Sequence, residues 1–243
     1  MRAVSRVVGG VSRRLGRPEL LAAVDRTARI AQREAVGIDA VLAAVLRDDG
    51  TYVDVGTNRG QVLAEAARVA PGAHLIAFEP IPDLAREVER RFPGADCRQK
   101  AVGARAETAE FCHFRKLDGW SGLRRSPEIS DSRGDPEYIT VEVSTLDAEL
   151  PDVDVSVLKI DVEGNELAVL EGGTGVLGRA RPTVIFEHVS DAAELYGYSS
   201  QALWDVLDGL GYRVFSVSGD GPVPRERFAR EPGIVNWLAA PRA

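Results

Sequence analysis

Acidic and glycine residues end the first predicted strand in a spacing that suits a cationic ligand. The strand is the run 51–55, and its end reads Asp54-Val-Gly56-Thr-Asn58-Arg-Gly60. A dinucleotide-binding turn needs the spacing G-x-G-x-x-G so that its backbone can approach a pyrophosphate. Here the glycines stand four apart, and Asn58 between them tolerates a left-handed backbone. The turn, with the Asp54 carboxylate, therefore favours a ligand with positive charge and no phosphate. The alternative is an ordinary glycine turn with a capping aspartate.

The second predicted strand ends in a further acidic residue. It reads Phe78-Glu79-Pro80, and Glu79 follows Asp54 by 25 residues. A carboxylate at this place accepts both ribose hydroxyls of a bound nucleoside, whether NAD or S-adenosylmethionine (SAM). SAM fits the preceding turn better, because it carries an ammonium and a sulfonium and no phosphate. The alternative role of Glu79 is to cap the helix that begins at Pro82.

Two later strand ends supply candidates for catalysis. Asp161 ends an apolar run in Leu158-Lys-Ile-Asp161-Val-Glu163-Gly164, and Glu187-His188 ends the next one. If these strands are neighbours, Asp161 and Glu187 can share a divalent cation such as magnesium. His188 is a candidate proton acceptor, because its ordinary pKa of about 6.5 suits work at neutral pH. The alternatives are a metal-free pair of carboxylates and a structural histidine.

Aromatic and hydroxyl residues near these strand ends are candidates for substrate contacts. Trp120 and Ser121 lie in the loop Asp118-Gly-Trp-Ser-Gly, where an indole could cover a sugar ring or the cofactor. Tyr196 and Tyr198 follow Glu187-His188 and could line an acceptor pocket. Simple packing is the alternative for all four.

Together with Ala101-Val-Gly103, these motifs resemble the FkbM family of SAM-dependent methyltransferases, and Lys-Ile-Asp-Val-Glu-Gly is the most specific part. The resemblance runs from about residue 51 to 217. It implies a class I methyltransferase fold and O-methylation of a hydroxyl on a sugar or a polyketide-like natural product. It also implies cofactor contacts: the methionine part of SAM at Asp54, Gly56, Asn58 and Gly60, the ribose at Glu79, with Pro80 beside it, and the adenine edge at residues 99–102, including Ala101. Gln99-Lys100 departs from the asparagine that members often have there.

The order of predicted elements supports an α/β fold. From residue 51 onward, strands alternate with helices, which predicts a doubly wound, mostly parallel sheet. We expect a strand over 96–102, a small β insertion over about 107–146, and a last antiparallel edge strand over 234–238. Before the sheet, residues 19–47 predict helices on either side of Gly37. The expected division is an N-terminal basic arm and helical cap at 1–47 and a methyltransferase domain at 48–243.

Composition and charge exclude several classes of protein. The chain has 243 residues, 44% of them hydrophobic and 28% charged, and a net charge of -7. Residues 1–35 carry an excess of five positive charges, which leaves -12 for the remainder. Because an acidic surface repels phosphate, we expect no nucleic-acid partner. No run of residues is long and apolar enough for a transmembrane segment or a secretory signal, so a cytoplasmic location is expected.

The sequence thus predicts a SAM-dependent O-methyltransferase that acts on a sugar, glycolipid or glycosylated natural product. An NAD-dependent oxidoreductase is the alternative within enzymes, disfavoured by the glycine spacing. A non-catalytic binding protein on a methyltransferase-like fold is the alternative outside them. The apolar N-terminal helices also make a homodimer possible, and the basic arm could recruit an anionic or lipid-linked acceptor.

Overall fold

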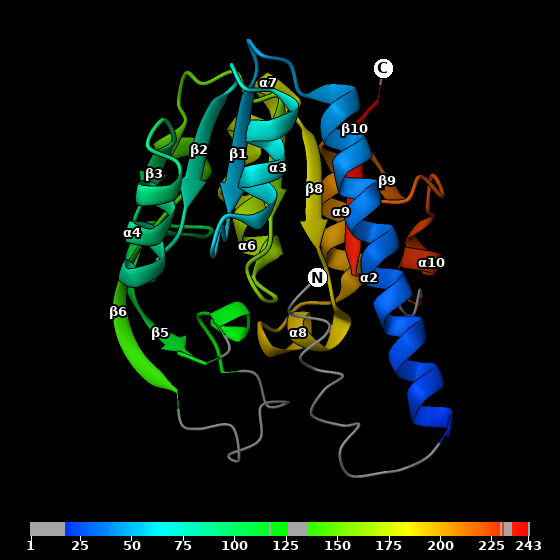
Figure 1. Cartoon of the computed structure of the whole chain (residues 1–243). Helices are drawn as coiled ribbons and strands as arrows, with labels where there is room; N and C mark the ends of the chain where they lie inside the picture. The colour runs from blue at the N-terminus through cyan, green and yellow to red at the C-terminus, as the bar shows by residue number, and fades with distance from the viewer. Residues whose placement is uncertain (1–17, 117, 126–135, 229, 231–234, 243) are drawn as a thin grey trace.

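The computed structural model describes residues 18–116, 118–125, 136–228, 230 and 235–242. The first 17 residues of the predicted basic arm and helical cap lie outside these ranges. The part of the chain that the structure describes forms one seven-stranded sheet, one three-stranded sheet and the helices around them. Figure 1 shows the larger sheet with helices on both faces and the smaller sheet at one end.

The seven-stranded sheet has the order β3-β2-β1-β7-β8-β10-β9. Its strands are β1 (Thr51–Val55), β2 (His74–Phe78), β3 (Asp96–Arg98), β7 (Val157–Ile160), β8 (Thr183–Glu187), β9 (Tyr212–Ser216) and β10 (Asn236–Pro241). In this order, β3, β2, β1, β7 and β8 pair as parallel neighbours. β10 is antiparallel to both of its neighbours, β8 and β9. The prediction of a doubly wound, mostly parallel sheet is therefore confirmed.

Two layers of helices cover the sheet. The first contains α2 (Pro18–Val45), α3 (Gln61–Val69) and α4 (Pro82–Arg91), and the second is built mainly from α6 (Glu166–Glu171), α7 (Thr174–Ala180) and α9 (Ser200–Gly209). The short helices are α5 (Leu146–Glu149), α8 (Ser190–Leu195) and α10 (Arg225–Phe228). Each layer buries its own apolar cluster against one face of the sheet, as expected for strands that are covered on both sides.

The predicted β insertion is present. Strands β5 (Glu107–His113) and β6 (Glu137–Ser144) pair antiparallel, and the 3₁₀ helix η1 (Asp118–Trp120) follows β5. The strand expected over 96–102 was wrong, because it divides into β3 and β4 (Ala101–Val102), and β4 pairs with β6 in the smaller sheet. This change of partner carries the insertion to the carboxyl ends of the parallel strands (Figure 1).

Two further expectations were wrong in detail. The expected edge strand over 234–238 is β10, which lies between β8 and β9 and not at an edge. The N-terminal helices are a single helix, α2, which continues through Gly37. A Cβ at Gly37 would lie 2.5 Å from the carbonyl oxygen of Val217, so this glycine allows α2 to approach the chain after β9.

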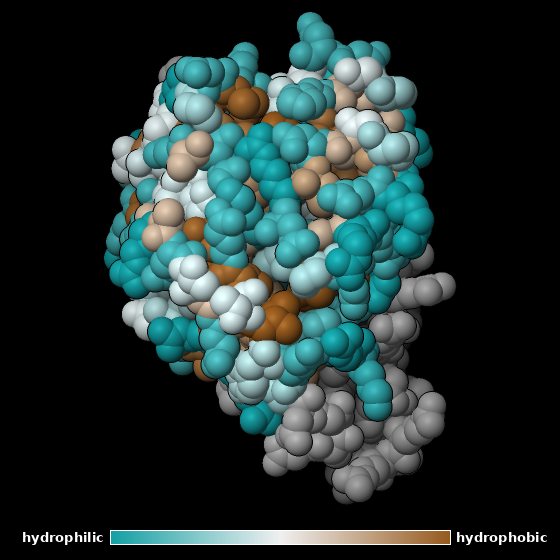
Figure 2. Space-filling model, turned by 90° about the vertical axis from the view of Figure 1, so that its left-hand side faces the viewer, coloured by the Kyte–Doolittle hydropathy of each residue, from teal (hydrophilic) through white to brown (hydrophobic). Residues whose placement is uncertain are grey.

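The second half of α2 belongs to the body of the fold. Ile38, Leu42 and Leu46 are buried in the same cluster as Tyr52 and Leu63. The division at residue 47 stays a prediction. On the side shown in Figure 2, hydrophilic side chains cover most of the surface, and hydrophobic ones emerge in small separate groups. Among the described residues, no helix combines the length and the apolar character needed to cross a membrane.

Candidate active site at the carboxyl ends of the strands

The site lies where the strand order reverses. The chain leaves β1 for β2 and β3 and later returns on the other side of β1 as β7. In sheets of this kind, ligands bind in the crevice beyond the carboxyl ends of the strands at such a point. A Cβ at Gly56, which follows β1, would lie 1.8 Å from the carbonyl oxygen of Asp161, which follows β7. The two turns therefore touch through their backbones, and only glycine fits at position 56.

The glycine-rich turn has the left-handed backbone that its sequence predicts. The φ angles are 80° at Gly56, 52° at Asn58 and 71° at Gly60. A side chain at Gly60 would also meet the Phe92 ring at 2.6 Å. The turn is further held by a hydrogen bond from the Thr57 hydroxyl to the Asp54 carbonyl oxygen, 2.9 Å long. Predicted cofactor residues Gly56, Asn58 and Gly60 are thus brought together in one rigid turn.

Asp54 is a buried carboxylate with an unused oxygen. The residue is 1% exposed, and its Oδ1 atom has no hydrogen-bond partner among the described residues. Burial raises the pKa of Asp54 to about 6, and the nearby Lys159 ammonium opposes this rise. A buried carboxylate oxygen without a hydrogen bond is costly, and the Lys159 ammonium, 3.8 Å from Oδ1, offsets part of this cost. The presence of this carboxylate beside the glycine turn is consistent with a cationic ligand that completes the site.

Glu79 is held by the glycine turn itself. Its Oε2 accepts a hydrogen bond from the Asn58 backbone N–H at 2.7 Å, and its Oε1 accepts one from the Ile81 N–H at 2.9 Å. Burial raises the pKa of Glu79 to about 7, although both of these donors oppose the rise. The carboxyl is therefore fixed in orientation at the end of β2. The bond to Ile81 reaches the residue before α4 and no N–H within the helix, so the capping role stays a prediction, and each carboxylate oxygen keeps a second lone pair for a ribose contact.

Lys159 connects Asp54 with Asp161, and the sequence analysis did not identify it as a site residue. Lys159 pairs in register with Asp54 across β1 and β7. Its buried ammonium lies 2.9 Å from Oδ2 of Asp161 and 3.8 Å from Oδ1 of Asp54. Burial opposes the charge of Lys159, but the two carboxylates raise its pKa above the ordinary value. The sequence does contain a signal for this contact: side chains alternate along a strand, so residues 159 and 161 lie on the same face.

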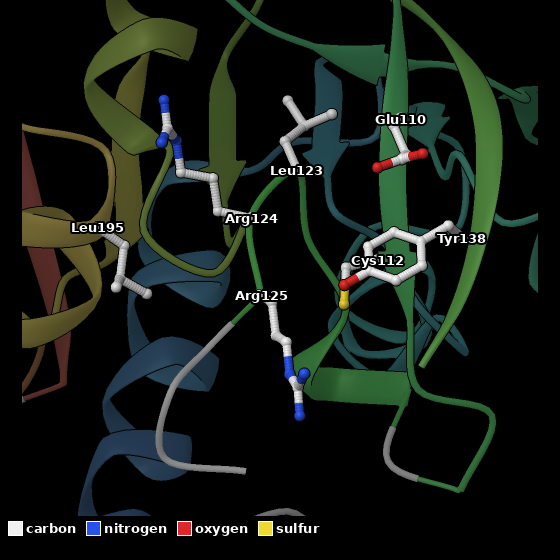
Figure 3. A pocket seen from close by; sticks show the side chains of 7 residues that line it. All are labelled: Glu110, Cys112, Leu123, Arg124, Arg125, Tyr138 and Leu195. Carbon is white, nitrogen blue, oxygen red and sulfur yellow. The ribbon is translucent and has the colours of Figure 1, made fainter. Parts of the chain in front are cut away.

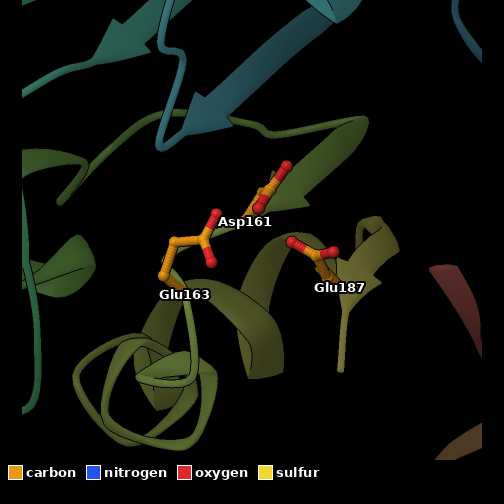
Figure 4. Close-up of side chains that lie close together, drawn as sticks. All are labelled: Asp161, Glu163 and Glu187. Carbon is orange, nitrogen blue, oxygen red and sulfur yellow. The ribbon is translucent and has the colours of Figure 1, made fainter. Parts of the chain in front are cut away.

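Three carboxylates meet beyond β7 and β8. Ligand oxygens of Asp161, Glu163 and Glu187 all lie within 4.8 Å of one another, and Figure 4 shows the carboxylates of Glu163 and Glu187 directed toward each other. The structure thus brings together Asp161 and Glu187, which the sequence placed on neighbouring strands. Glu163 is an addition. Its backbone has the left-handed φ angle of 56°, which brings the side chain toward the other two carboxylates. The period of a strand does not predict such a turn.

The cluster divides its charge unevenly. Burial alone would raise the pKa of Asp161, but Lys159 and a hydrogen bond with Glu187 lower it below the ordinary value. Burial, and then the negative charge of Asp161, raise the pKa values of Glu163 and Glu187. At neutral pH, Asp161 is therefore ionised, while Glu163 and Glu187 retain protons more readily than ordinary glutamates do.

Glu166 shapes the turn that carries this cluster. Its Oε1 accepts hydrogen bonds from the Gly164 N–H at 3.0 Å and the Val162 N–H at 3.3 Å. The Tyr198 hydroxyl donates to the Gly164 carbonyl oxygen at 2.7 Å and lies 3.1 Å from Oε2 of Glu166. Tyr198 thus stabilises this turn through its hydroxyl group. Its contact with an acceptor stays a prediction.

His188 lies in a tightly packed setting. It is 4% exposed, its Nε2 lies 2.8 Å from the Ser200 hydroxyl, and its ring stacks on Phe228 at 5.1 Å. Nδ1 has no partner among the described residues. Burial lowers the pKa of His188 to about 4. The imidazole is therefore neutral at pH 7, but it is a weak proton acceptor.

The remaining predicted residues border this region. Ala101 and Pro80 are buried beside the end of β2. The Ser121 hydroxyl accepts a hydrogen bond from the Phe114 N–H at 3.0 Å, and Trp120 packs against Phe114. The Tyr196 hydroxyl accepts a hydrogen bond from the Arg124 N–H at 3.1 Å. Trp120 and Ser121 thus have packing roles in this structure, and their contact with a substrate stays a prediction.

Comparison with known proteins identifies the family. Residues 54–214, more than half of the chain, match the methyltransferase FkbM domain. The chain belongs to the FkbM methyltransferase family. The matched range begins at Asp54 and includes the glycine turn and every carboxylate described above.

Individual FkbM relatives and similar proteins agree with this assignment. The chain is 30% identical over 152 residues to methyltransferase sdnD of Sordaria araneosa, covering 49% of this chain and 59% of that protein. It is 25% identical over 146 residues to methyltransferase 1 of Beauveria bassiana, covering 51% and 59%. The chain thus matches about three fifths of the length of these curated relatives. A crystal structure of methyltransferase FkbM from Methylobacillus flagellatus matches with a TM-score of 0.51 and 16% identity, over 80% of this chain and 44% of that one. This likeness confirms the class I methyltransferase fold.

Proposed function

We propose that this protein transfers the methyl group of SAM to a hydroxyl oxygen of a sugar, glycolipid or glycosylated natural product. The observation that carries the proposal is the buried Asp54 carboxylate, whose Oδ1 has no hydrogen-bond partner among the described residues, beside a glycine turn at the reversal of strand order. Membership of the FkbM family supports the reaction. The hydroxyl acceptor rests on the resemblance to that family.

The residues present fit SAM. Bound SAM supplies an electrophilic methyl group on a positively charged sulfur. Asp54 would bind the ammonium of the methionine part of SAM. Because no side chain fits at Gly56, the turn there presents only backbone. Glu79, already oriented by two N–H donors, would accept the ribose hydroxyls. Ala101 and Pro80 would border the adenine.

The acidic cluster is positioned to receive the proton of the acceptor. A sugar hydroxyl has a pKa far above 7, so the oxygen needs a base as it attacks. Asp161 is the more accessible candidate, because its side chain is 33% exposed and that of His188 is buried; Lys159 keeps Asp161 ionised, and its lowered pKa makes it, like His188, a weak base. Glu187, which shares a hydrogen bond with Asp161, would hold it in place. His188 is the second candidate, and comparison of Asp161→Asn with His188→Asn separates the two.

A divalent cation is a further part of the proposal. Asp161, Glu163 and Glu187 offer oxygen ligands of the kind that magnesium prefers, and a cation would lower the raised pKa values of the two glutamates. Lys159 already places one positive charge at Asp161. Addition of EDTA therefore tests the metal directly: loss of turnover that magnesium restores supports it, and unchanged turnover removes it.

The proposed activity is tested with SAM that carries a trideuteromethyl group. Purified protein is incubated with this SAM and with glycan and glycolipid extracts, and mass spectrometry searches for products that have gained the labelled methyl. We expect labelled methyl ethers and S-adenosylhomocysteine. Binding of S-adenosylhomocysteine without any labelled product would favour the non-catalytic alternative, and binding of NAD in its place would favour the oxidoreductase.

A further inference from the structure

A hollow of about 350 Å³ opens between the β insertion and α8. Its walls come from β5, β6, the segment 123–125 and the end of α8 (Figure 3), and the residues that line it are Glu110, Cys112, Leu123, Arg124, Arg125, Tyr138 and Leu195. This volume lies within the range of pockets that hold small molecules. Neither the glycine turn over residues 56–60 nor the acidic cluster of Asp161, Glu163 and Glu187 lines it.

The hollow carries arginines in a chain that is acidic as a whole. Arg124 and Arg125 follow each other in the chain, and their side chains extend in opposite directions (Figure 3). The Arg124 guanidinium lies over the Tyr196 ring, 5.6 Å from the ring centre. A guanidinium that contacts an aromatic ring keeps N–H donors for a planar oxyanion, a carboxylate or one face of a phosphate.

The hollow borders the acidic cluster through Tyr196. The Tyr196 hydroxyl accepts a hydrogen bond from the Arg124 N–H. A Cβ at Gly122 would lie 3.2 Å from that hydroxyl and 3.6 Å from Cβ of Glu163. The segment that carries Arg124 therefore passes close to Cβ of Glu163, which belongs to the acidic cluster.

We propose that this hollow binds the acceptor and that Arg124 selects acceptors that carry an oxyanion, a phosphate or a carboxylate, close to the hydroxyl to be methylated. The inference rests on the proposed methyl transfer. Arg124 and Arg125 outnumber the one carboxylate that lines the hollow, Glu110, so the hollow attracts an anionic acceptor although the chain as a whole is acidic. Leu123, Leu195 and Tyr138 supply apolar and aromatic surface for the body of the acceptor.

The test compares matched neutral and anionic sugars. Glucose, glucuronate and glucose 6-phosphate are titrated calorimetrically into the full-length protein, with and without saturating S-adenosylhomocysteine. We expect at least one anionic sugar to bind about tenfold more tightly than glucose, and this advantage to shrink at high salt. Glucuronate and glucose 6-phosphate separate a carboxylate acceptor from a phosphate acceptor.

Variants of Arg124 give the decisive comparison. Arg124→Gln should remove the roughly tenfold preference for the anion, and Arg124→Lys should keep part of it, because the charge remains but the planar edge is lost. Arg86→Gln is the control, since Arg86 is an exposed arginine that pairs with Asp83 on α4, away from the hollow. Near-ultraviolet circular dichroism shows that each variant is folded.

The results overturn this inference if neither anion binds better than glucose, or if Arg124→Gln binds the anion as the wild type does. Failure of the proposed function gives a different result. In that case S-adenosylhomocysteine does not bind, whereas the titrations without it still report on Arg124. Binding of S-adenosylhomocysteine without anion preference contradicts the acceptor inference alone.

Discussion

At the scale of single residues, the site is a set of buried charges that a few partners keep in different protonation states. Lys159 keeps Asp161 ionised, while burial makes Asp54, Glu79 and Glu187 hold protons more strongly than exposed carboxylates do. Sequence alone identified these four acidic residues from their places at strand ends. It missed Lys159 and Glu163, because the role of each depends on which strands become neighbours and on a left-handed turn.

His188 gives a prediction at this scale. Its folded-state pKa is about 4, against an ordinary value of 6.5, so the unfolded chain binds its proton more readily. The contribution of His188 to the free energy of unfolding is therefore fully present above about pH 6.5. As the pH falls toward 4, this free energy decreases by roughly 3 kcal/mol. Urea unfolding of wild type and His188→Asn across this range should show a flatter acid limb for the variant. Equal slopes would show that His188 titrates normally in the folded protein.

At the scale of elements, the contact between two turns explains why residue types are restricted. The turn after β1 and the turn after β7 touch at Gly56 and Asp161. The sequence predicted β1 over its observed range 51–55 and the end of β2 at Phe78, because a glycine or a proline follows closely after each strand. The division of β3 from β4 was not predictable, since a two-residue strand has no period and its partner β6 lies far along the chain.

Gly56→Ala tests the contact between the turns. The φ of 80° and the overlap with the Asp161 carbonyl oxygen should cost at least about 2 kcal/mol of unfolding free energy and abolish cofactor binding. Gly178→Ala is the matched control: Gly178 lies in α7 with nothing within 4 Å of an added Cβ, so this change should be neutral or stabilise by up to about 1 kcal/mol. Similar thermal unfolding curves for the two variants would contradict the close approach.

At the scale of the whole molecule, α2 is attached to the sheet through one buried carboxylate. Glu34 accepts hydrogen bonds from the backbone N–H groups of Val235 and Asn236, at 2.8 and 3.2 Å, and from the Asn236 side chain at 3.1 Å. The helical pattern of α2 was readable from the sequence. Its docking beside β10 was not, because Glu34 and its partners are separated by about 200 residues.

Glu34→Ala should therefore destabilise the whole fold. The change leaves three donors without their acceptor, so we expect a loss of about 2 to 3 kcal/mol in urea unfolding. Glu65→Ala serves as the control, because Glu65 forms an exposed ion pair with Arg68 within α3, and exposed ion pairs contribute little to stability. An equal, small effect of both changes would mean that α2 docks through its apolar side chains alone.

The central claim, that the strand ends form a SAM site, is tested most directly by calorimetric titration of S-adenosylhomocysteine. The wild type should bind it at one site, more weakly as the pH falls from about 8 to 5, because Asp54 and Glu79, with pKa values of about 6 and 7, lose their charge in this range. Asp54→Asn should bind about tenfold more weakly at about pH 8, while Asp83→Asn, a change of an exposed residue on α4, should match the wild type. Absence of binding by the folded wild-type protein, or equal binding by Asp54→Asn, would contradict the account.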